Sequence, residues 1–264
     1  MQIVELIERM DATFHPEYQE SYDNSGFLLG DPQRTLTGVL TALDLTEAVA
    51  EEAIEKGLNL IVTHHPMIFG GLKRITPDTI VGRIVLRLVE SGVAVYAAHT
   101  NLDNLKAGVN GILAAQLGLD DCHILRPQNG DPDVGAGMVG TLPSPMPTAH
   151  FLASLKETLH LNTLRVGVGA LDIRSSIQRV AICGGAGKFL IGDAIAAKAD
   201  VYITGDLKYH DFQEAERRIV LVDIGHYESE QFSRGLLAGA VEALGDGSFK
   251  TVVATACDRW EVWV

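Results

Sequence analysis

Apolar positions in the first half of this chain follow two patterns, one typical of amphipathic helices and one typical of buried strands. Ile3, Leu6, Ile7 and Met10 recur at helical spacing, so the chain opens with a predicted short helix. Residues 58–62 form a continuous apolar run, which is typical of a strand covered on both faces. The same criteria predict further strands at 38–43 and 93–98, and further helices at 46–57 and 76–92. Strands that alternate with helices in this way predict a βαβ layer.

The second half of the chain shows the same alternation after a segment rich in Gly, Pro and Asp. This segment, residues 126–147, has the composition of a linker with a short hairpin. Beyond it, the pattern predicts helices at 151–159, from 189 and at 228–244, and strands at 164–168, 179–183, 201–204, 219–223, 251–256 and 260–264. We therefore expect an α/β protein with two α/β lobes, residues 1–126 and residues 127–264.

Composition narrows the class of protein. Its 264 residues are 47% hydrophobic and 21% charged, which is typical of a folded domain with a sizeable core. The 21 Lys and Arg residues against 34 Asp and Glu residues leave a net charge of −13, which disfavours nucleic acids and membranes as partners. The three cysteines, Cys122, Cys183 and Cys257, are widely spaced and predict reduced thiols. Because the start lacks a basic signal-peptide region and no long uncharged apolar run occurs, we expect a soluble cytoplasmic protein.

Polar side chains of one chemical kind follow three of the predicted strands. They are, strand by strand, His64 and His65, His99 and Asp103, and His226 and Glu230. In open α/β sheets, ligands bind at the carboxyl ends of the strands, and all of these residues lie just past such ends. His226 and Glu230 are four residues apart, so on a helix that begins by Gly225 they project from one face and can share an ion.

Imidazole and carboxylate groups without thiolate predict a site for Zn, Fe, Mn, Co or Ni. The predicted metal ligands are His64, His65, Asp103, His226 and Glu230, and five ligands with two bridging carboxylates indicate two divalent ions. Asp44, Asp206 and Asp223 also fall near strand ends and are predicted to orient the imidazoles. A single histidine after a strand is more often a loop or core residue, so the metal interpretation depends on the coincidence of three strand ends.

Several segments together resemble the Nif-three-like family, also called the GTP cyclohydrolase I type 2 homologues or YbgI-like dinuclear metal-centre proteins. They are DNSGFLLGD (23–31), LNLIVTHHPMIFGGLKRI (58–75), VYAAHTNLDN with the later GVN (95–110), VYITGDLKYHDFQEA (201–215) and VDIGHYESE (222–230). These segments cover most of both predicted lobes, and the combination of THHP, HTNLD and GHYESE is highly specific.

The resemblance implies that the five predicted ligands hold two divalent metals at strand ends between two α/β lobes. It also implies a toroidal homohexamer, and the length of the chain implies that the middle domain inserted in longer members is absent. If the family name describes its chemistry, the substrate is GTP, whose purine ring is opened by hydrolysis.

Two further motifs have weaker interpretations. Residues 183–189, CGGAGKF, differ from a phosphate-binding loop because Ile182 stands where its first Gly belongs and Phe189 stands where a Ser or Thr is required. A turn that packs closely at a helix start is favoured, although Lys188 can contact an anion. Residues 205–211 form either a solvated loop or a group of substrate contacts, with Lys208 or His210 as a phosphate contact or proton carrier.

The sequence favours a metal-dependent hydrolase that acts on an anionic small molecule such as a nucleotide. His99 and His210 are the predicted proton-transfer residues, with His99 beside the metal ligands rather than among them. Asp23 and Asn24 are predicted to lie in a turn or to contact the substrate. The alternatives are a phosphoester or amide hydrolase, and a protein without catalytic activity that stores or delivers metal or forms a toroidal scaffold.

Overall fold

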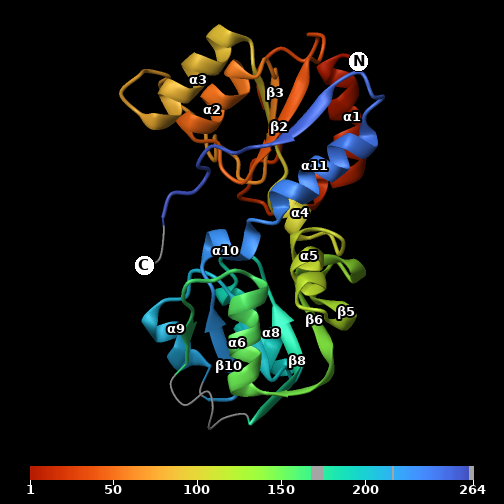
Figure 1. Cartoon of the computed structure of the whole chain (residues 1–264), viewed down its shortest axis with the longest axis vertical. Helices are drawn as coiled ribbons and strands as arrows, with labels where there is room; N and C mark the ends of the chain where they lie inside the picture. Colours follow the sequence, from red (N-terminus) through yellow and green to blue (C-terminus); the bar gives the residue numbers. More distant parts are fainter. Residues whose placement is uncertain (168–174, 216, 262–264) are drawn as a thin grey trace. The chain divides into compact units, whose positions relative to one another are not determined.

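The structure, a computed structural model, describes residues 1–167, 175–215 and 217–261 (Figure 1). The chain divides into two compact units. The first comprises Met1–Leu102 and Ser233–Glu261, and the second comprises Asp103–Phe232. Among the described residues, no helix combines the length and the apolar character needed to cross a membrane.

The first unit is built on a mostly parallel sheet with the strand order β1-β4-β3-β2-β11. Its strands are β1 (Gly26–Leu29), β2 (Gly38–Ala42), β3 (Leu60–Thr63), β4 (Ala94–Ala97) and β11 (Lys250–Val253). Only β1 runs antiparallel to its neighbour, β4, whereas β3 pairs in parallel with both β2 and β4. The carboxyl ends of β2, β3 and β4 therefore lie along one edge of the sheet.

Helices cover both faces of this sheet (Figure 1). They are α1 (Ile3–Phe14), α2 (Glu47–Glu55), α3 (Ile80–Ser91) and α11 (Ser233–Leu244). A short 3-10 helix at Pro16–Tyr18 follows α1, and α4 (Thr100–Asp103) follows β4. Leu40 and Ile61 of the strands pack with Val49 of α2 and Leu88 of α3 in one buried cluster. The sheet is buried on both faces, as the continuous apolar run at 58–62 predicts.

The second unit has a mixed sheet with the strand order β5-β6-β8-β9-β10-β7. Its strands are β5 (Asp120–Gln128), β6 (Asp131–Pro147), β7 (Arg165–Val166), β8 (Ser176–Ile182), β9 (Val201–Thr204) and β10 (Val220–Asp223). Its helices are α5 (Val109–Gln116), α6 (Thr148–Thr158), a 3-10 turn at Lys188–Leu190, α8 (Ile191–Ala196), α9 (Tyr209–Glu214) and α10 (His226–Glu230). Because β8, β9 and β10 are parallel neighbours, the loops that follow them emerge at one edge.

Alternate residues of the central strands in this unit pack against different helices. Ile203 and Val222 belong to a cluster that includes residues of α5 and α6, whereas Tyr202 and Leu221 belong to a cluster that includes residues of α8. Period-two burial of this kind is the packing expected of a sheet covered on both faces.

The division of the chain differs from the predicted boundary at residue 126. Residues 103–126 belong to the second unit, and residues 233–261 return to the first, where β11 pairs with β2. The predicted helix at 228–244 is two helices, α10 and α11, separated where the chain passes between the units. The hydrophobic pattern of a helix indicates which of its faces is buried but not which sheet it covers. No periodic signal in the sequence therefore marks the passage of the chain from one unit to the other between α10 and α11.

Three other predictions about elements need correction. The helix predicted from residue 76 begins at Ile80, because the Thr79 hydroxyl accepts the Gly82 N–H and caps it. The short hairpin predicted within 126–147 is confirmed, since β5 and β6 pair through Asn129 and Gly130, both with positive φ, but these strands also occupy the residues predicted as linker. Asn-Gly is the typical sequence for such a turn. Part of the strand predicted at 260–264 lies outside the described residues, and residues 260–261 are not in a strand. Residue 168, the last of the strand predicted at 164–168, also lies outside the described residues.

Candidate metal centre

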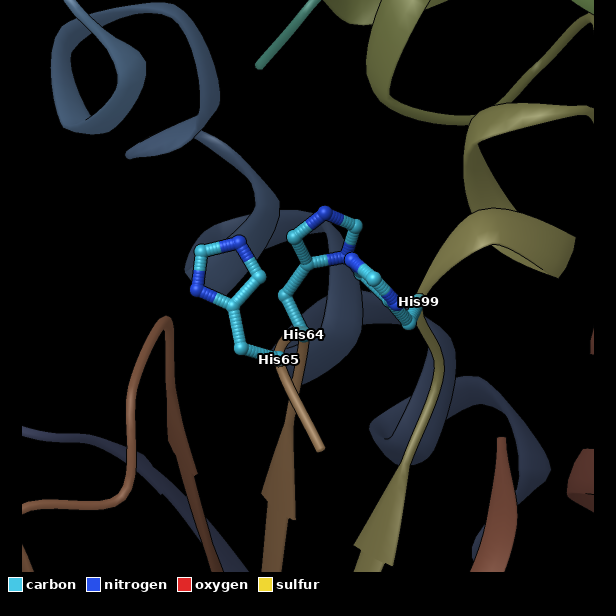
Figure 2. Close-up of side chains that lie close together, drawn as sticks. All are labelled: His64, His65 and His99. Atoms are coloured by element: carbon cyan, nitrogen blue, oxygen red, sulfur yellow. The ribbon is translucent and has the colours of Figure 1, made fainter. Parts of the chain in front are cut away.

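Three histidines of the first unit gather at the carboxyl ends of two neighbouring strands. His64 and His65 directly follow β3, and His99 follows β4 (Figure 2). The imidazole centroids lie 5.0 Å apart for His64 and His65, and each lies 5.3–5.4 Å from that of His99. One ring nitrogen from each of the three lies within 4.8 Å of the others, so this group can hold a metal ion. The parallel pairing of β3 with β4 brings these residues together.

Each of these imidazoles has its Nδ1 atom beside an oxygen acceptor. His64 Nδ1 lies 2.8 Å from the Ala98 carbonyl, and His65 Nδ1 lies 3.1 Å from Asp44 Oδ1. His99 Nδ1 lies 2.7 Å from Asp23 Oδ1. An acceptor at Nδ1 favours the tautomer that carries its proton there, which leaves the lone pair of Nε2 to bind a metal.

The carboxylate of Asp23 is fully buried and connects the strand end to the segment before β1. It accepts hydrogen bonds from the Thr100 N–H at 3.0 Å and the Ser25 hydroxyl at 3.1 Å, in addition to its contact with His99. Burial opposes ionisation, but the hydrogen bonds from His99 and Thr100 outweigh it and hold the pKa of Asp23 well below its usual range. Asp23 therefore stays charged and fixes the orientation of the His99 ring.

The second unit has a histidine with the same arrangement. His226 opens α10, and its Nδ1 lies 2.8 Å from Asp206 Oδ2 while its Nε2 lies 3.0 Å from Glu230 Oε2. Burial by itself would lower the pKa of His226, but Glu230 and Asp206 outweigh it and raise the pKa to about 11. The two carboxylates beside this imidazole therefore stabilise positive charge, and they would stabilise the charge of a bound divalent cation in the same way. The helix begins after Gly225, so the predicted pairing of His226 with Glu230 across one turn is confirmed.

Glycines of the loop after β8 make room for the Glu230 carboxylate. A Cβ atom at Gly185 would lie 2.3 Å from Glu230 Oε1, and Gly185 has a φ of +61°. Its N–H donates to the Ser229 hydroxyl at 2.9 Å, which ties the loop to α10. The motif at 183–189 is thus a close-packing turn at a helix start, as its departure from a phosphate-binding loop predicts.

Asp103 lies in the same part of the second unit. One of its carboxylate oxygens is within 4.8 Å of one from Glu230, and both carboxylates, after burial, contribute to the raised pKa of the Cys183 thiol. Asn110, of the GVN segment, donates to the Asp103 carbonyl at 3.1 Å and accepts from the Gly184 N–H at 3.0 Å. Asn110 therefore connects the Asp103 backbone to the glycine loop.

The donor atoms fit a divalent metal of the first transition series. Imidazole nitrogens and carboxylate oxygens are the ligands that Zn, Fe, Mn, Co and Ni accept. The buried thiol of Cys183 is held protonated by burial and by the neighbouring carboxylates, so it does not add a soft ligand. Both units thus contain His, Asp or Glu side chains of the kinds that bind such metals.

Two of the three carboxylates predicted to orient imidazoles do so, namely Asp44 and Asp206. Asp223 instead accepts the N–H groups of Leu207 and Gly225 and pairs with Arg165 at 2.8 Å. Burial raises the pKa of Asp223, although those contacts oppose the shift. Its position at the end of β10 suits a role in shaping the loop after β9.

Other predicted polar contacts lie apart from these groups. His210 is exposed on α9 and belongs to none of the groups of described residues that can hold a metal. The Lys188 ammonium pairs with Asp211 at 2.7 Å and with Glu214 at 3.2 Å, and both contacts raise its pKa. Lys208 is exposed, and its backbone N–H donates to Asp211 at the start of α9.

Comparison with known proteins identifies the family of the chain. The model of the family Duf34/NIF3 (NGG1p interacting factor 3) matches residues 1–257. The chain belongs to this family. A Duf34/NIF3 relative from Clostridium perfringens, named GTP cyclohydrolase 1 type 2 homolog, is 36% identical over 231 residues, which are 87% of this chain and 87% of the relative. The predicted resemblance is therefore confirmed.

Solved structures support the fold. A crystal structure of Staphylococcus aureus hypothetical protein SA1388 matches with a TM-score of 0.87 and 30% identity, covering 97% of this chain and 96% of that one. The structure of reduced HcgD from Methanocaldococcus jannaschii matches with a TM-score of 0.80 and 27% identity, covering 96% and 97%. The predicted α/β fold of the Duf34/NIF3 family is confirmed.

Sequence reasoning left open the role of Asp23 and gave none to the Ala98 carbonyl. Asp23 lies 76 residues from His99 in the chain and meets it because β1 pairs antiparallel with β4. No local spacing signals such a contact. Asp23 would have been found only from a prediction of which strand lies beside β4.

Proposed function

We propose that this protein is a metal-dependent hydrolase with two divalent ions held by His64, His65, Asp103, His226 and Glu230. The observation that carries the proposal is the set of Nδ1 contacts: an oxygen acceptor faces Nδ1 of each of the three ligand histidines. Carboxylate and carbonyl partners of this kind are typical of metal-binding histidines, because they fix the tautomer and the orientation of the ring.

The proposed donor set suits the charge of two divalent ions. The first unit contributes His64 and His65, which are neutral donors, whereas the second contributes Asp103, His226 and Glu230, with two negative charges. A pair of divalent ions requires carboxylates to balance its charge, and bridging carboxylates hold two ions together.

Two bound divalent ions would supply Lewis acidity and lower the pKa of a bound water toward neutrality. His99, held by Asp23, is the favoured group for moving a proton to or from the substrate, because it lies beside His64 and His65. His210 is the second candidate. The charge of the ions suits an anionic substrate despite the net charge of −13.

We further propose GTP as the first substrate to test, with hydrolytic opening of the purine ring at C8 and release of formate. The name of the Clostridium perfringens relative supports this choice. The predicted homohexamer belongs to the same proposal, and light scattering of the purified protein measures it directly.

Metal content tests the ligand set. We expect two divalent ions per chain in the wild-type protein by elemental analysis, and a marked loss in His64→Ala and in Glu230→Ala. His150→Ala and Glu242→Ala, which change exposed residues of α6 and α11, are matched controls that should keep the metal. Metal that stays substoichiometric after reconstitution, or that is unchanged in both ligand variants, would contradict the proposed centre.

Formate release tests the reaction. Protein loaded with Mn, Fe or Zn is incubated with GTP, and formate is measured over time beside the metal-depleted protein. We expect release that depends on metal and is lost in Glu230→Ala. Full loading without formate release under any of these metals would favour the phosphoester or amide hydrolase, or a role in metal delivery.

A further inference from the structure

An exposed pair of aromatic side chains stands beside the histidines of the first unit. The rings of Tyr22 and Phe69 stack with their centroids 6.3 Å apart, and the rings of Phe69 and His99 form a T-shaped pair with centroids 5.9 Å apart. Tyr22 is 62% exposed and Phe69 is 50% exposed. At this degree of exposure, part of each ring is not covered by the protein. Another aromatic ring can stack on that surface, beside the polar His99 side chain.

Buried contacts hold the pair in place. Tyr22 directly precedes Asp23, whose buried carboxylate binds His99 and Thr100. Asn24 Nδ2 donates to the Ile68 carbonyl at 2.5 Å, which ties the residue before Phe69 to the same segment. The aromatic pair and the His99 ring are therefore positioned by one hydrogen-bonded network, although they come from three separate stretches of the chain.

The loop that carries Phe69 also carries two cations. Lys73 and Arg74 are exposed, and neither forms a hydrogen bond or an ion pair with any residue that the structure describes. Other cations of this acidic chain, such as Arg83, Arg87 and Lys188, are paired with carboxylates. Cations without a partner among the described residues, in the loop that carries an exposed aromatic ring, suit a ligand that has both a planar ring and an anionic group.

We propose that Tyr22 and Phe69 bind the planar ring of the substrate beside His99, and that Lys73 and Arg74 bind its anionic group. The ligand class is an aromatic heterocycle linked to phosphate, of which a purine nucleotide is one example. This proposal rests on the hydrolase proposed above, and it adds residues that determine the choice of substrate without binding metal.

Equilibrium binding with three probes separates the two contributions. Isothermal titration calorimetry measures the affinity of metal-loaded protein for GTP, guanosine and inorganic tripolyphosphate. Phe69→Leu should weaken GTP and guanosine about tenfold and leave tripolyphosphate unchanged, because stacking is lost and charge is not. Lys73→Gln combined with Arg74→Gln should weaken GTP and tripolyphosphate and leave guanosine unchanged.

Matched controls come from exposed residues of the same unit. Val89→Ala removes an apolar side chain that is 57% exposed on α3, and Lys250→Gln removes an exposed cation on β11. Both should bind all three probes as the wild type does. Metal content should be unchanged in every variant, which separates a failure of this proposal from a failure of the proposed metal centre.

Three results would overturn the proposal. One is wild-type protein that binds neither GTP nor guanosine up to the solubility limit of each. Another is Phe69→Leu protein that loses affinity for tripolyphosphate as much as for guanosine. The third is Phe69→Leu protein that binds normally but changes its mass in light scattering, which would assign the aromatic pair to contacts between copies of the chain.

Discussion

Gly185 and the Glu230 carboxylate are so close that no side chain fits between them. A Cβ atom at Gly185 would lie 2.3 Å from Glu230 Oε1 and 3.3 Å from His226 Cε1, and the backbone there has a φ of +61°. Only glycine combines this φ with the absence of a Cβ atom. The loop after β8 therefore sets the position of a proposed metal ligand on α10.

Gly185→Ala should weaken metal binding about tenfold or more, because Glu230 must move away from the new methyl group. The measurement is a competitive titration with a metal chelator. Gly192→Ala is the matched control, since a Cβ atom there meets no other atom within 4 Å. It lies within helix α8, so it should keep wild-type affinity and gain slightly in stability. Equal affinities in the two variants would contradict the role of the loop.

Asp206→Asn should lower metal affinity by about 10–100-fold, because the neutral amide no longer supports the His226 ring as the carboxylate does. Asn tolerates the φ of +56° at this position, so the backbone should be unchanged. Chelator competition is again the measurement, with the exposed Asp121→Asn as control. A variant indistinguishable from its control would show that Asp206 does not orient a ligand.

Glu52→Gln should destabilise the first unit by about 1–3 kcal/mol at pH 7. The buried Glu52 carboxylate accepts the N–H groups of Thr255 and Ala256 and pairs with Lys56, which connects α2 to the segment after β11. Burial opposes ionisation, but these contacts prevail and lower the pKa from 4.5 to about 2.

A lowered pKa in the folded state contributes stability above the unfolded pKa, and the contribution is lost as the pH falls. The difference between wild type and Glu52→Gln should therefore shrink as the pH falls from about 4.5 toward about 2. Urea unfolding at several pH values measures it, with the exposed Glu55→Gln as control. A difference that is independent of pH would assign the effect to packing.

His99→Gln should abolish most of the formate release while keeping the metal content, if His99 moves a proton rather than binding metal. His210→Gln, which changes an exposed residue of α9, is the comparison. Loss of metal in His99→Gln would make His99 a ligand, and a greater loss of turnover in His210→Gln would reverse their proposed roles.

Most elements of the fold could be predicted because their signals are local. The helix at 47–55 begins where Thr46 caps it, and Gly92 ends α3 in the left-handed conformation that glycine favours. The hairpin predicted within 126–147 also has a local signal, the Asn129-Gly130 turn, although its strands extend through residues predicted as linker.

The proposed ligands could be predicted for the same reason, since each lies within a few residues of the carboxyl end of a strand. Their oxygen partners were predictable only in part. Asp44 and Asp206 fall at strand ends and were recognised, whereas Asp23 reaches His99 through the pairing of β1 with β4.

The sequence by itself therefore determined the family, the α/β class and the residues at the strand ends, because hydrophobic period and motif spacing act over a few residues. The tertiary structure alone decided that β11 returns to the first sheet, that Asp23 holds His99, that Gly185 makes room for Glu230, and that Tyr22 stacks on Phe69. These contacts join residues from 45 (Gly185 and Glu230) to more than 200 positions apart (β2 and β11), and such pairs meet only after strand order has been set by packing of the whole sheet.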